Sequence, residues 1–238
     1  MRPSKRIFCI IFLFFSPSIL ALAIRSFVAM PIEQGGIVFR AQDFINTKTD
    51  MNNVVGDIGY GIANKHAIFL RYPEMINAVS GMPTQDVSLL YRYTFLQKDN
   101  TNTTFRIALL SGGFVPTNSG SDGGLKGGFV TSYFKGRNEF DGDVLYDGAF
   151  GSAKNYGNYD LSWQYRIYPA KYSEWGLGSS VNTVLEYTGQ WMEKANMAHQ
   201  ATLGLQWVMP QLILEGGLIK DLNQSYANIV FIGLRVHI

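Results

Sequence analysis

Three features of the sequence predict an all-β chain that folds as a transmembrane, antiparallel, up-and-down β-barrel of about twelve strands. Segments with apolar residues at every second position recur from about residue 36 onward, a period that fits strands and not helices. Short polar turns alternate along the chain with longer polar connections. The first 23 residues have the pattern of an export signal.

The N-terminal segment joins a basic start to a short apolar stretch. Three basic residues within the first six positions precede the run IFCIIFLFF, and Ala21-Leu22-Ala23 has small residues at the spacing of a cleavage site. This pattern predicts residues 1–23 as a signal peptide cleaved after Ala23; a single transmembrane anchor is the alternative. We expect residues 24–35 to form a periplasmic N-terminal segment and residues 36–238 to form the barrel.

Removal of the signal would change both the charge and the cysteine content. The whole chain has 20 Lys and Arg against 18 Asp and Glu. Three of the basic residues lie in the signal, which leaves 17 against 18, a formal net charge of −1 in place of +2. A nucleic-acid partner therefore has no electrostatic basis. Cys9, the one cysteine, also lies in the signal, so the mature chain has no disulfide.

The composition favours strands over membrane helices. Only 16% of residues are charged, yet the mean hydropathy is +0.02, close to neutral. After residue 30 no stretch approaches the roughly 20 consecutive apolar residues that a spanning helix needs. The 13 tyrosines, 16 phenylalanines and 25 glycines suit sheets joined by tight turns.

Alternation is clearest in YDLSWQYRI, where Tyr159, Leu161, Trp163 and Tyr165 share one face and polar residues the other. Most such runs approach the roughly 9–11 residues with which a tilted strand crosses a bilayer. The first, third and eleventh alternate least regularly, so ten strands is the alternative count. The predicted strands are 36–45, 53–62, 66–73, 85–95, 103–115, 125–135, 139–147, 156–168, 174–188, 198–209, 212–220 and 226–238.

The connections between these strands alternate in length. Short or moderate turns are expected at 63–65, 97–102, 136–137, 168–173 and 210–211. Longer polar stretches, such as PTNSGSDGG, lie between them at 73–84, 116–124, 148–155 and 189–197. Short periplasmic turns and longer extracellular loops are typical of outer-membrane barrels.

Alternation by itself does not tell lipid from a protein core, so a soluble sandwich or a lipocalin-like barrel is the competing fold. The polar face carries both signs of charge, which suits a crowded lumen. Aromatic residues such as Tyr93, Phe95, Tyr165, Trp175 and Trp207 lie on the apolar face near short turns, as in a membrane-interface belt. The lumen-lining candidates are Arg71, Asp86, Arg92, Arg106, Asp160, Arg166, Glu186, Glu215 and Arg235.

Three stretches resemble a known family in their layout. DIGYGIANKHAIFLRYP, DVSLLYRYTF and FRIALLSGGFVPT form a strand, a short turn and further strands, the last ending in Pro-Thr before a Gly-rich loop. This layout is similar to outer-membrane barrels named after the meta pathway of phenol degradation. The resemblance implies a transporter or porin and carries over no functional residue. The closing strand resembles the signal read by the barrel-assembly machinery, although it ends on Ile238 and not on an aromatic residue.

No catalytic or cofactor constellation stands out. None of His66, His199 and His237 is followed two positions later by serine, the pair that outer-membrane lipid hydrolases place on one strand. SGSDGGLKGG lacks the spacing of a phosphate loop, and DGDVLYDG lacks the distal ligands of a calcium loop. We therefore expect no enzyme, no cofactor and no metal site, and we interpret Asp141 and Asp143 as lumen carboxylates.

Taken together, the features predict a transporter or narrow porin in the outer membrane of a Gram-negative bacterium. Opposed charges in the lumen would create a transverse field that selects small polar or zwitterionic solutes, whose identity is unknown. Twelve strands fall between packed small barrels and open large ones, so a plugged barrel that acts as a structural or surface-binding protein is the alternative. The expected partners are outer-membrane lipid, a small solute and the barrel-assembly machinery, with no nucleic acid.

Overall fold

The computed structural model describes residues 23–48, 52–76, 86–117, 122–151, 154–170, 178–223 and 228–238. Within these residues no helix is long and apolar enough to cross a membrane. Twelve strands are present: β1 (Ile37–Asn46), β2 (Asn52–Ala63), β3 (His66–Ile76), β4 (Val87–Asn100), β5 (Thr103–Val115), β6 (Gly124–Lys135), β7 (Asn138–Ala149), β8 (Tyr156–Tyr168), β9 (Ser180–Met192), β10 (Ala198–Val208), β11 (Leu212–Asp221) and β12 (Asn228–His237).

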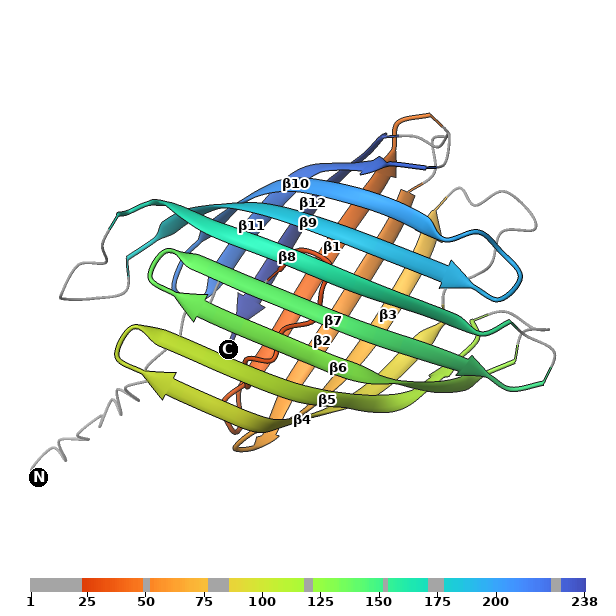
Figure 1. The fold of residues 1–238 in the computed structure, drawn as a ribbon, viewed down its shortest axis with the longest axis horizontal. Helices are drawn as coiled ribbons and strands as arrows, with labels where there is room; N and C mark the ends of the chain where they lie inside the picture. Colours follow the sequence, from red (N-terminus) through yellow and green to blue (C-terminus); the bar gives the residue numbers. More distant parts are fainter. Residues whose placement is uncertain are drawn as a thin grey trace, which may run out of the picture.

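The strands form one closed, antiparallel ring (Figure 1). Each strand pairs with its neighbours in sequence, and β1 closes the ring by pairing with β12 over Val38↔His237 to Asn46↔Ile229. Because the sheet has no open edge, the strands satisfy one another's backbone groups, which is the condition for a sheet to lie in hydrocarbon. The predicted up-and-down barrel of twelve strands, and not ten, is confirmed.

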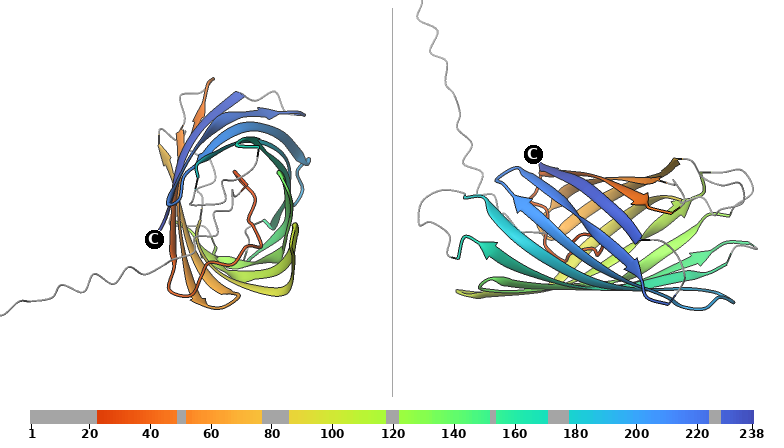
Figure 2. Two further views of the ribbon diagram at one scale, coloured as in Figure 1. Left: turned by 90° about the vertical axis from the view of Figure 1, so that its left-hand side faces the viewer. Right: turned by 90° about the horizontal axis from the view of Figure 1, so that it is seen from above.

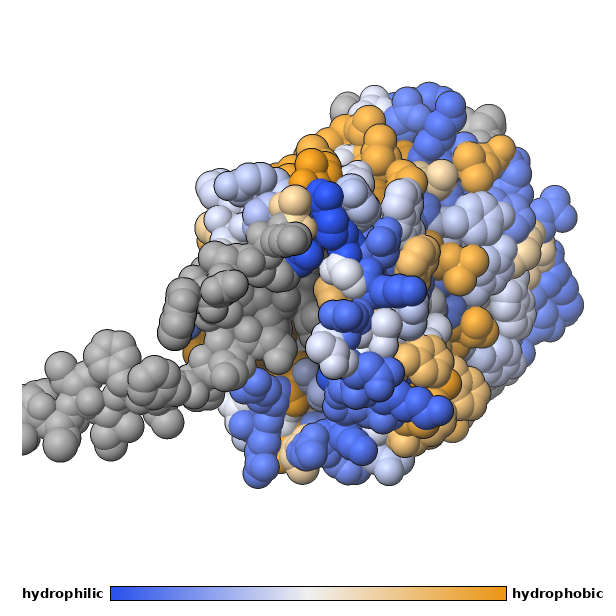
Figure 3. Space-filling view, turned by 60° about the vertical axis from the view of Figure 1, so that its left-hand side comes forward, coloured by the Kyte–Doolittle hydropathy of each residue, from blue (hydrophilic) through white to orange (hydrophobic). Residues whose placement is uncertain are grey.

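Alternation along each strand sorts side chains to the two faces of the wall. Large apolar side chains are exposed outside; in β10, for example, Leu203, Leu205 and Trp207 are exposed and Thr202 and Gln206 are buried. In a soluble barrel the pattern would be inverted, so the wall is built for an apolar surrounding. Figure 3 shows hydrophobic patches on the outer wall and hydrophilic residues around the mouth.

The closing strand follows the same rule. In β12, Ile232 and Leu234 are exposed, while Phe231 and Arg235 are buried in the lumen. After the strand, Ile238 is 76% exposed and exchanges backbone hydrogen bonds with Ile37 at 2.8 and 2.9 Å. The apolar parity predicted to face lipid therefore points outward.

The connections confirm most of the predicted asymmetry and correct one part of it. The end of the barrel where β1 begins carries tight turns at 64–65, 101–102, 136–137 and 209–211. The same end also carries the long connection 169–179, where we expected a moderate turn and a strand beginning at residue 174.

The late start of β9 has a physical cause in β8. β8 ends at Tyr168, which pairs with Val181, and the next residue is Pro169. Proline has no backbone N–H to donate, so the ladder stops there and β9 gains no partner before Ser180. The predicted strand members Trp175 and Leu177 lie outside the described residues.

Candidate functional site in the lumen

The lumen has two walls of opposite charge. The order of strands in the ring places β12 and β1 to β5 on one arc and β7 to β9 on another. The first arc, here called the basic wall, carries Arg40, Arg71, Arg92, Arg106 and Arg235. The second arc, here called the acidic wall, carries Glu139, Asp141, Asp143, Asp160 and Glu186, all of them buried.

Three arginines of the basic wall, Arg40, Arg71 and Arg235, are balanced by two carboxylates. Asp57 of β2 pairs with Arg71, with Oδ1 2.6 Å from Nε. Glu215 of β11 has its Oε1 3.0 Å from Arg40 Nη2 and its Oε2 3.5 Å from Arg235 Nη2. Because β11 adjoins β12, Glu215 lies next to the arginines that it pairs with.

Glu215 is also the acceptor for two neutral side chains. The Gln42 amide donates to its Oε1 at 2.9 Å, and the Gln206 amide donates to its Oε2 at 3.0 Å. Both carboxylate oxygens are thereby used, so Glu215 anchors a buried polar network at the closing strands.

The carboxylates of the acidic wall are held by neutral donors. Asp141 accepts from the Ser132 hydroxyl at 2.5 Å and from the Gln164 amide at 3.1 Å. Asp160 accepts from the Thr188 hydroxyl and from the Asn158 amide. Among the described residues, no lysine or arginine side chain forms an ion pair within 4.0 Å with any carboxylate of this wall.

An N-terminal segment, Ala23–Met30, lies inside the ring between the two walls (Figure 2). Its amide groups donate towards strands β6, β7 and β9: Phe27 N lies 2.7 Å from Asp143 Oδ2, and Ala29 N lies 2.9 Å from Ser132 Oγ. Its carbonyl groups accept from the basic wall, as Val28 O does from Arg92 Nη1 at 2.6 Å. The segment is therefore bonded to both walls.

The location of this segment differs from the periplasmic one that we expected for residues 24–35. Six of the eight residues from 23 to 30 are buried, and the chain then returns towards the start of β1. On the way it is hydrogen-bonded to β2, with Gly35 N 2.8 Å from Gly61 O and Gly61 N 3.0 Å from Gly36 O. A Cβ on Gly61 would lie 2.0 Å from Glu33 O, so this docking requires glycine at position 61.

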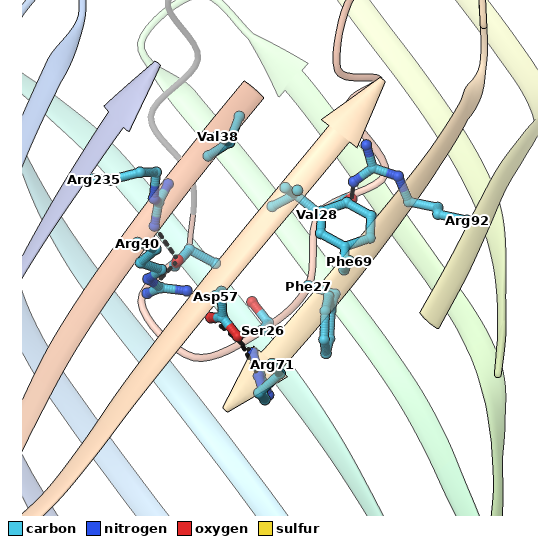
Figure 4. A pocket seen from close by; sticks show the side chains of 12 residues that line it. Ser26, Phe27, Val28, Val38, Arg40, Asp57, Phe69, Arg71, Arg92 and Arg235 are labelled. Atoms are coloured by element: carbon cyan, nitrogen blue, oxygen red, sulfur yellow. Dashed lines mark hydrogen bonds and ion pairs between the residues drawn. The ribbon is translucent and has the colours of Figure 1, made fainter. Parts of the chain in front are cut away.

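A cavity of about 70 Å³ remains between the segment and the basic wall (Figure 4). Arg71 lies over the Phe27 ring and Arg92 over the Phe69 ring, each 4.7 Å from the centroid. Two buried nitrogen atoms, Arg92 Nη2 and Arg235 Nη1, have no hydrogen-bond partner among the described residues. The cavity, lined by four arginines and by Asp57, is therefore suited to an anionic group.

The predicted lumen residues fall into two groups. Six of them line the inside of the barrel wall: Arg71, Arg92, Asp160, Glu186, Glu215 and Arg235. The other three lie nearer the ends of the barrel. Arg106 binds Asp99 at 3.4 Å and Met30 Sδ at 2.9 Å, and Arg166 donates to the Gly136 carbonyl at 3.3 Å.

Asp86, the third of these, precedes β4 at the end with the longer connections. Its partial burial, and then the nearby Asp147 carboxylate, raise the pKa of Asp86, while Lys126 acts in the opposite direction. Lys126 itself pairs with Asp147 at 3.0 Å. These charges lie at this end of the barrel, away from the segment 23–30.

Sequence reasoning missed Glu139 of the acidic wall and two further parts of the site. Arg40 and Gln42 belong to β1, where their alternation with Phe39 and Ala41 was available as a signal. The lumen location of residues 23–30 had no such signal, because the segment has no strand or helix period. Within the described residues, no cluster of three or more His, Cys, Asp or Glu could hold a metal ion.

Comparison with proteins of known structure identifies the type of fold. No family model and no curated protein matches the sequence. The structure is similar to that of the NanC porin, with a TM-score of 0.60 and 12% identity over 83% of this chain and 98% of the porin. It is also similar to an outer-membrane channel from Pseudomonas putida F1, with a TM-score of 0.58 and 14% identity over 91% of this chain and 99% of that one. The fold is that of an outer-membrane β-barrel. At these identities the similarity establishes the architecture of the barrel only.

Proposed function

We propose that this protein is a transporter or narrow porin in the outer membrane of a Gram-negative bacterium. The observation that carries the proposal is the pair of oppositely charged walls inside a closed ring of twelve strands. Fixed charges of opposite sign across a pore create a transverse field, and such a field orients a dipolar solute as it passes. The NanC porin and the Pseudomonas putida channel have the same architecture.

The lining suggests the class of solute. A small polar or zwitterionic molecule could place its negative group against the arginines and its positive group against Asp143, Asp160 or Glu186. The cavity already offers two guanidinium nitrogens, on Arg92 and Arg235, that have no hydrogen-bond partner in the part of the chain that the structure describes. Membership of the meta-pathway phenol-degradation family, which the strand layout resembles, is part of this proposal.

Conduction requires the segment Ala23–Met30 to move. Its hydrogen bonds hold it between the two walls of the lumen, beside the cavity of about 70 Å³. Displacement of the segment towards the end where β1 begins would free both walls at once. We propose that the segment acts as the gate of the pore.

The remaining assignments follow from the surface and the termini. The exposed apolar side chains of the outer wall would contact outer-membrane lipid. Residues 1–23 would direct export and be cleaved, and the barrel-assembly machinery would bind β12 as the chain inserts.

A non-conducting structural or surface-binding barrel is the second candidate. The observation that favours it is the segment itself, which lies in the lumen and is bonded on both sides. If the segment never leaves, the barrel does not conduct and only its outer loops can bind a partner.

Single-channel recording in a planar bilayer distinguishes the two candidates. We expect the refolded mature protein to conduct in a gated manner, and a chain that begins at Pro31 to have a larger unitary conductance because the segment is absent. A chain of full mature length that carries a scrambled sequence at 24–30 serves as the control for removal of the specific contacts. Absence of conductance in all three proteins would refute the pore.

A further inference from the structure

The residue that follows the predicted cleavage site occupies an apolar socket in the lumen. Ile24 is fully buried and packs with Val184, Ile219 and Phe231. A Cβ at position 204 would lie 2.3 Å from Ile24 Cδ1, so Gly204 leaves the space that the isoleucine side chain fills. The wall is therefore shaped to this side chain.

The backbone of Ile24 is bound on both sides of the socket. Its nitrogen donates to Glu186 Oε1 at 2.8 Å, and Arg25 N lies 3.1 Å from both oxygens of the same carboxylate. Its carbonyl oxygen accepts from Arg40 and, at 3.0 Å, from Gln42 Nε2. Side chain, amide and carbonyl thus each have a dedicated partner.

Glu186 at this socket is a buried carboxylate that forms no ion pair with a side chain of the described residues. It is 4% exposed, and among the described residues no basic side chain lies within ion-pair distance of it. The adjacent strand β8 adds Asp160 to the same wall. Burial of an ionised carboxylate costs free energy unless a positive group neutralises it. A cation at the position of Ile24 N would therefore stabilise Glu186.

We propose that Glu186 is the binding site for the α-ammonium group of the mature chain, which begins at Ile24. Hydrolysis of the Ala23–Ile24 peptide bond by the leader peptidase of the exporting cell consumes one water molecule. Ala23 leaves with the new carboxylate, and Ile24 keeps an amine that takes up a proton. The positive charge then arises on the atom 2.8 Å from Glu186 Oε1, and a hydrogen bond becomes a buried ion pair.

Cleavage has a second effect on the lumen. The Ala23 carbonyl, which accepts from Arg40 at 3.4 Å and from Arg235 at 3.3 Å, leaves with the signal peptide. Ala23 also lines the cavity, so its loss enlarges the cavity beside these arginines. Processing would therefore seat the segment more firmly at the acidic wall and free donors at the basic wall. This inference goes beyond the proposed pore and holds whether or not the barrel conducts.

Amine labelling tests the proposal without any measurement of conductance. The full-length precursor is exported, purified in detergent and treated with N-hydroxysuccinimidyl acetate, and mass spectrometry follows the N-terminal peptide. We expect the mature chain to begin at Ile24 and its α-amine to react at least about tenfold more slowly than after denaturation, because the reagent reaches it only when the segment opens. Exposed lysines such as Lys194 provide the internal standard.

Two altered proteins complete the test. Glu186→Gln should raise the labelling rate of the α-amine, whereas Glu139→Gln, which removes another buried carboxylate of the acidic wall, should not. A chain expressed without residues 1–23 keeps its initiator methionine before Ile24, which displaces the amine by one residue, up to about 3.8 Å. After refolding, its α-amine should react faster than that of the exported protein, and this comparison stands even if Glu186→Gln does not fold.

Three results would overturn the proposal. One is a mature chain that begins at a residue other than Ile24. Another is an α-amine in the exported protein that reacts as fast as in the methionine-extended chain. The third is equal labelling in Glu186→Gln and Glu139→Gln.

Discussion

Glu215→Gln is expected to destabilise the barrel strongly. At 3.0 Å from Arg40 and 3.5 Å from Arg235, the carboxylate interacts with each guanidinium by about 5 kcal/mol at an effective dielectric constant near 20. The amide removes this attraction and leaves two buried arginines side by side. Loss of one partner of a buried ion pair typically costs about 3–5 kcal/mol, and we expect a decrease of that size in the free energy of unfolding.

The assay is equilibrium unfolding by guanidinium chloride in detergent micelles, followed by the fluorescence of the chain's four tryptophans. Glu139→Gln is the matched control. Glu139 is 3% exposed and its Oε1 has no hydrogen-bond partner among the described residues. Its neutralisation should change the free energy of unfolding by less than about 1 kcal/mol, or raise it. Equal effects of the two substitutions would refute the reasoning that Glu215 neutralises the closing arginines.

Three further substitutions test the lumen, the outer wall and the closing strand. Replacement of both Arg92 and Arg106 by Ala should shift the ion selectivity of the pore towards cations; an unchanged reversal potential would place both arginines off the ion path. Leu161 is 57% exposed on the outer wall, and Leu161→Arg should lower the free energy of unfolding in lipid by about 2–4 kcal/mol. The control Asn64→Arg, in a turn, should have little effect. Equal effects of the two substitutions would contradict a lipid-facing Leu161. Ile238→Phe keeps the backbone bonds with Ile37 and should improve insertion by the assembly machinery, measured as the heat-modifiable fraction on unboiled gels; unimproved insertion would count against β12 as the recognition signal.

Local pattern was enough to predict the strands of this barrel. A strand exposes alternate residues to two surroundings, so the side-chain period of two is present in the sequence before any folding occurs. The first, third and eleventh runs alternate least regularly, yet all three form strands. A closed ring requires every strand to pair with a strand on each side, so the neighbours of these runs could not close without them. The start of β9 was not predictable from its own residues, because the ladder with β8 stops at Pro169, the residue that follows β8.

The lumen site was predictable only in part. The parity of Arg92, Glu186, Glu215 and Arg235 placed them inside, but no sequence pattern states that the arginines and the acids occupy opposite arcs of the ring. That segregation depends on which strands face one another across the lumen. It is a property of the closed ring and not of any strand.

What the sequence alone determined is therefore local: the strands, their two faces and the short turns, each encoded within about a dozen neighbouring residues. Only the tertiary structure decided that Ala23–Met30 lies within the lumen and that Ile24 N meets Glu186, which is 162 positions away in sequence. Such a contact arises because ring closure brings strands that are distant in sequence around one segment. Its energy comes from charges whose proximity cannot be read from the local alternation of residues.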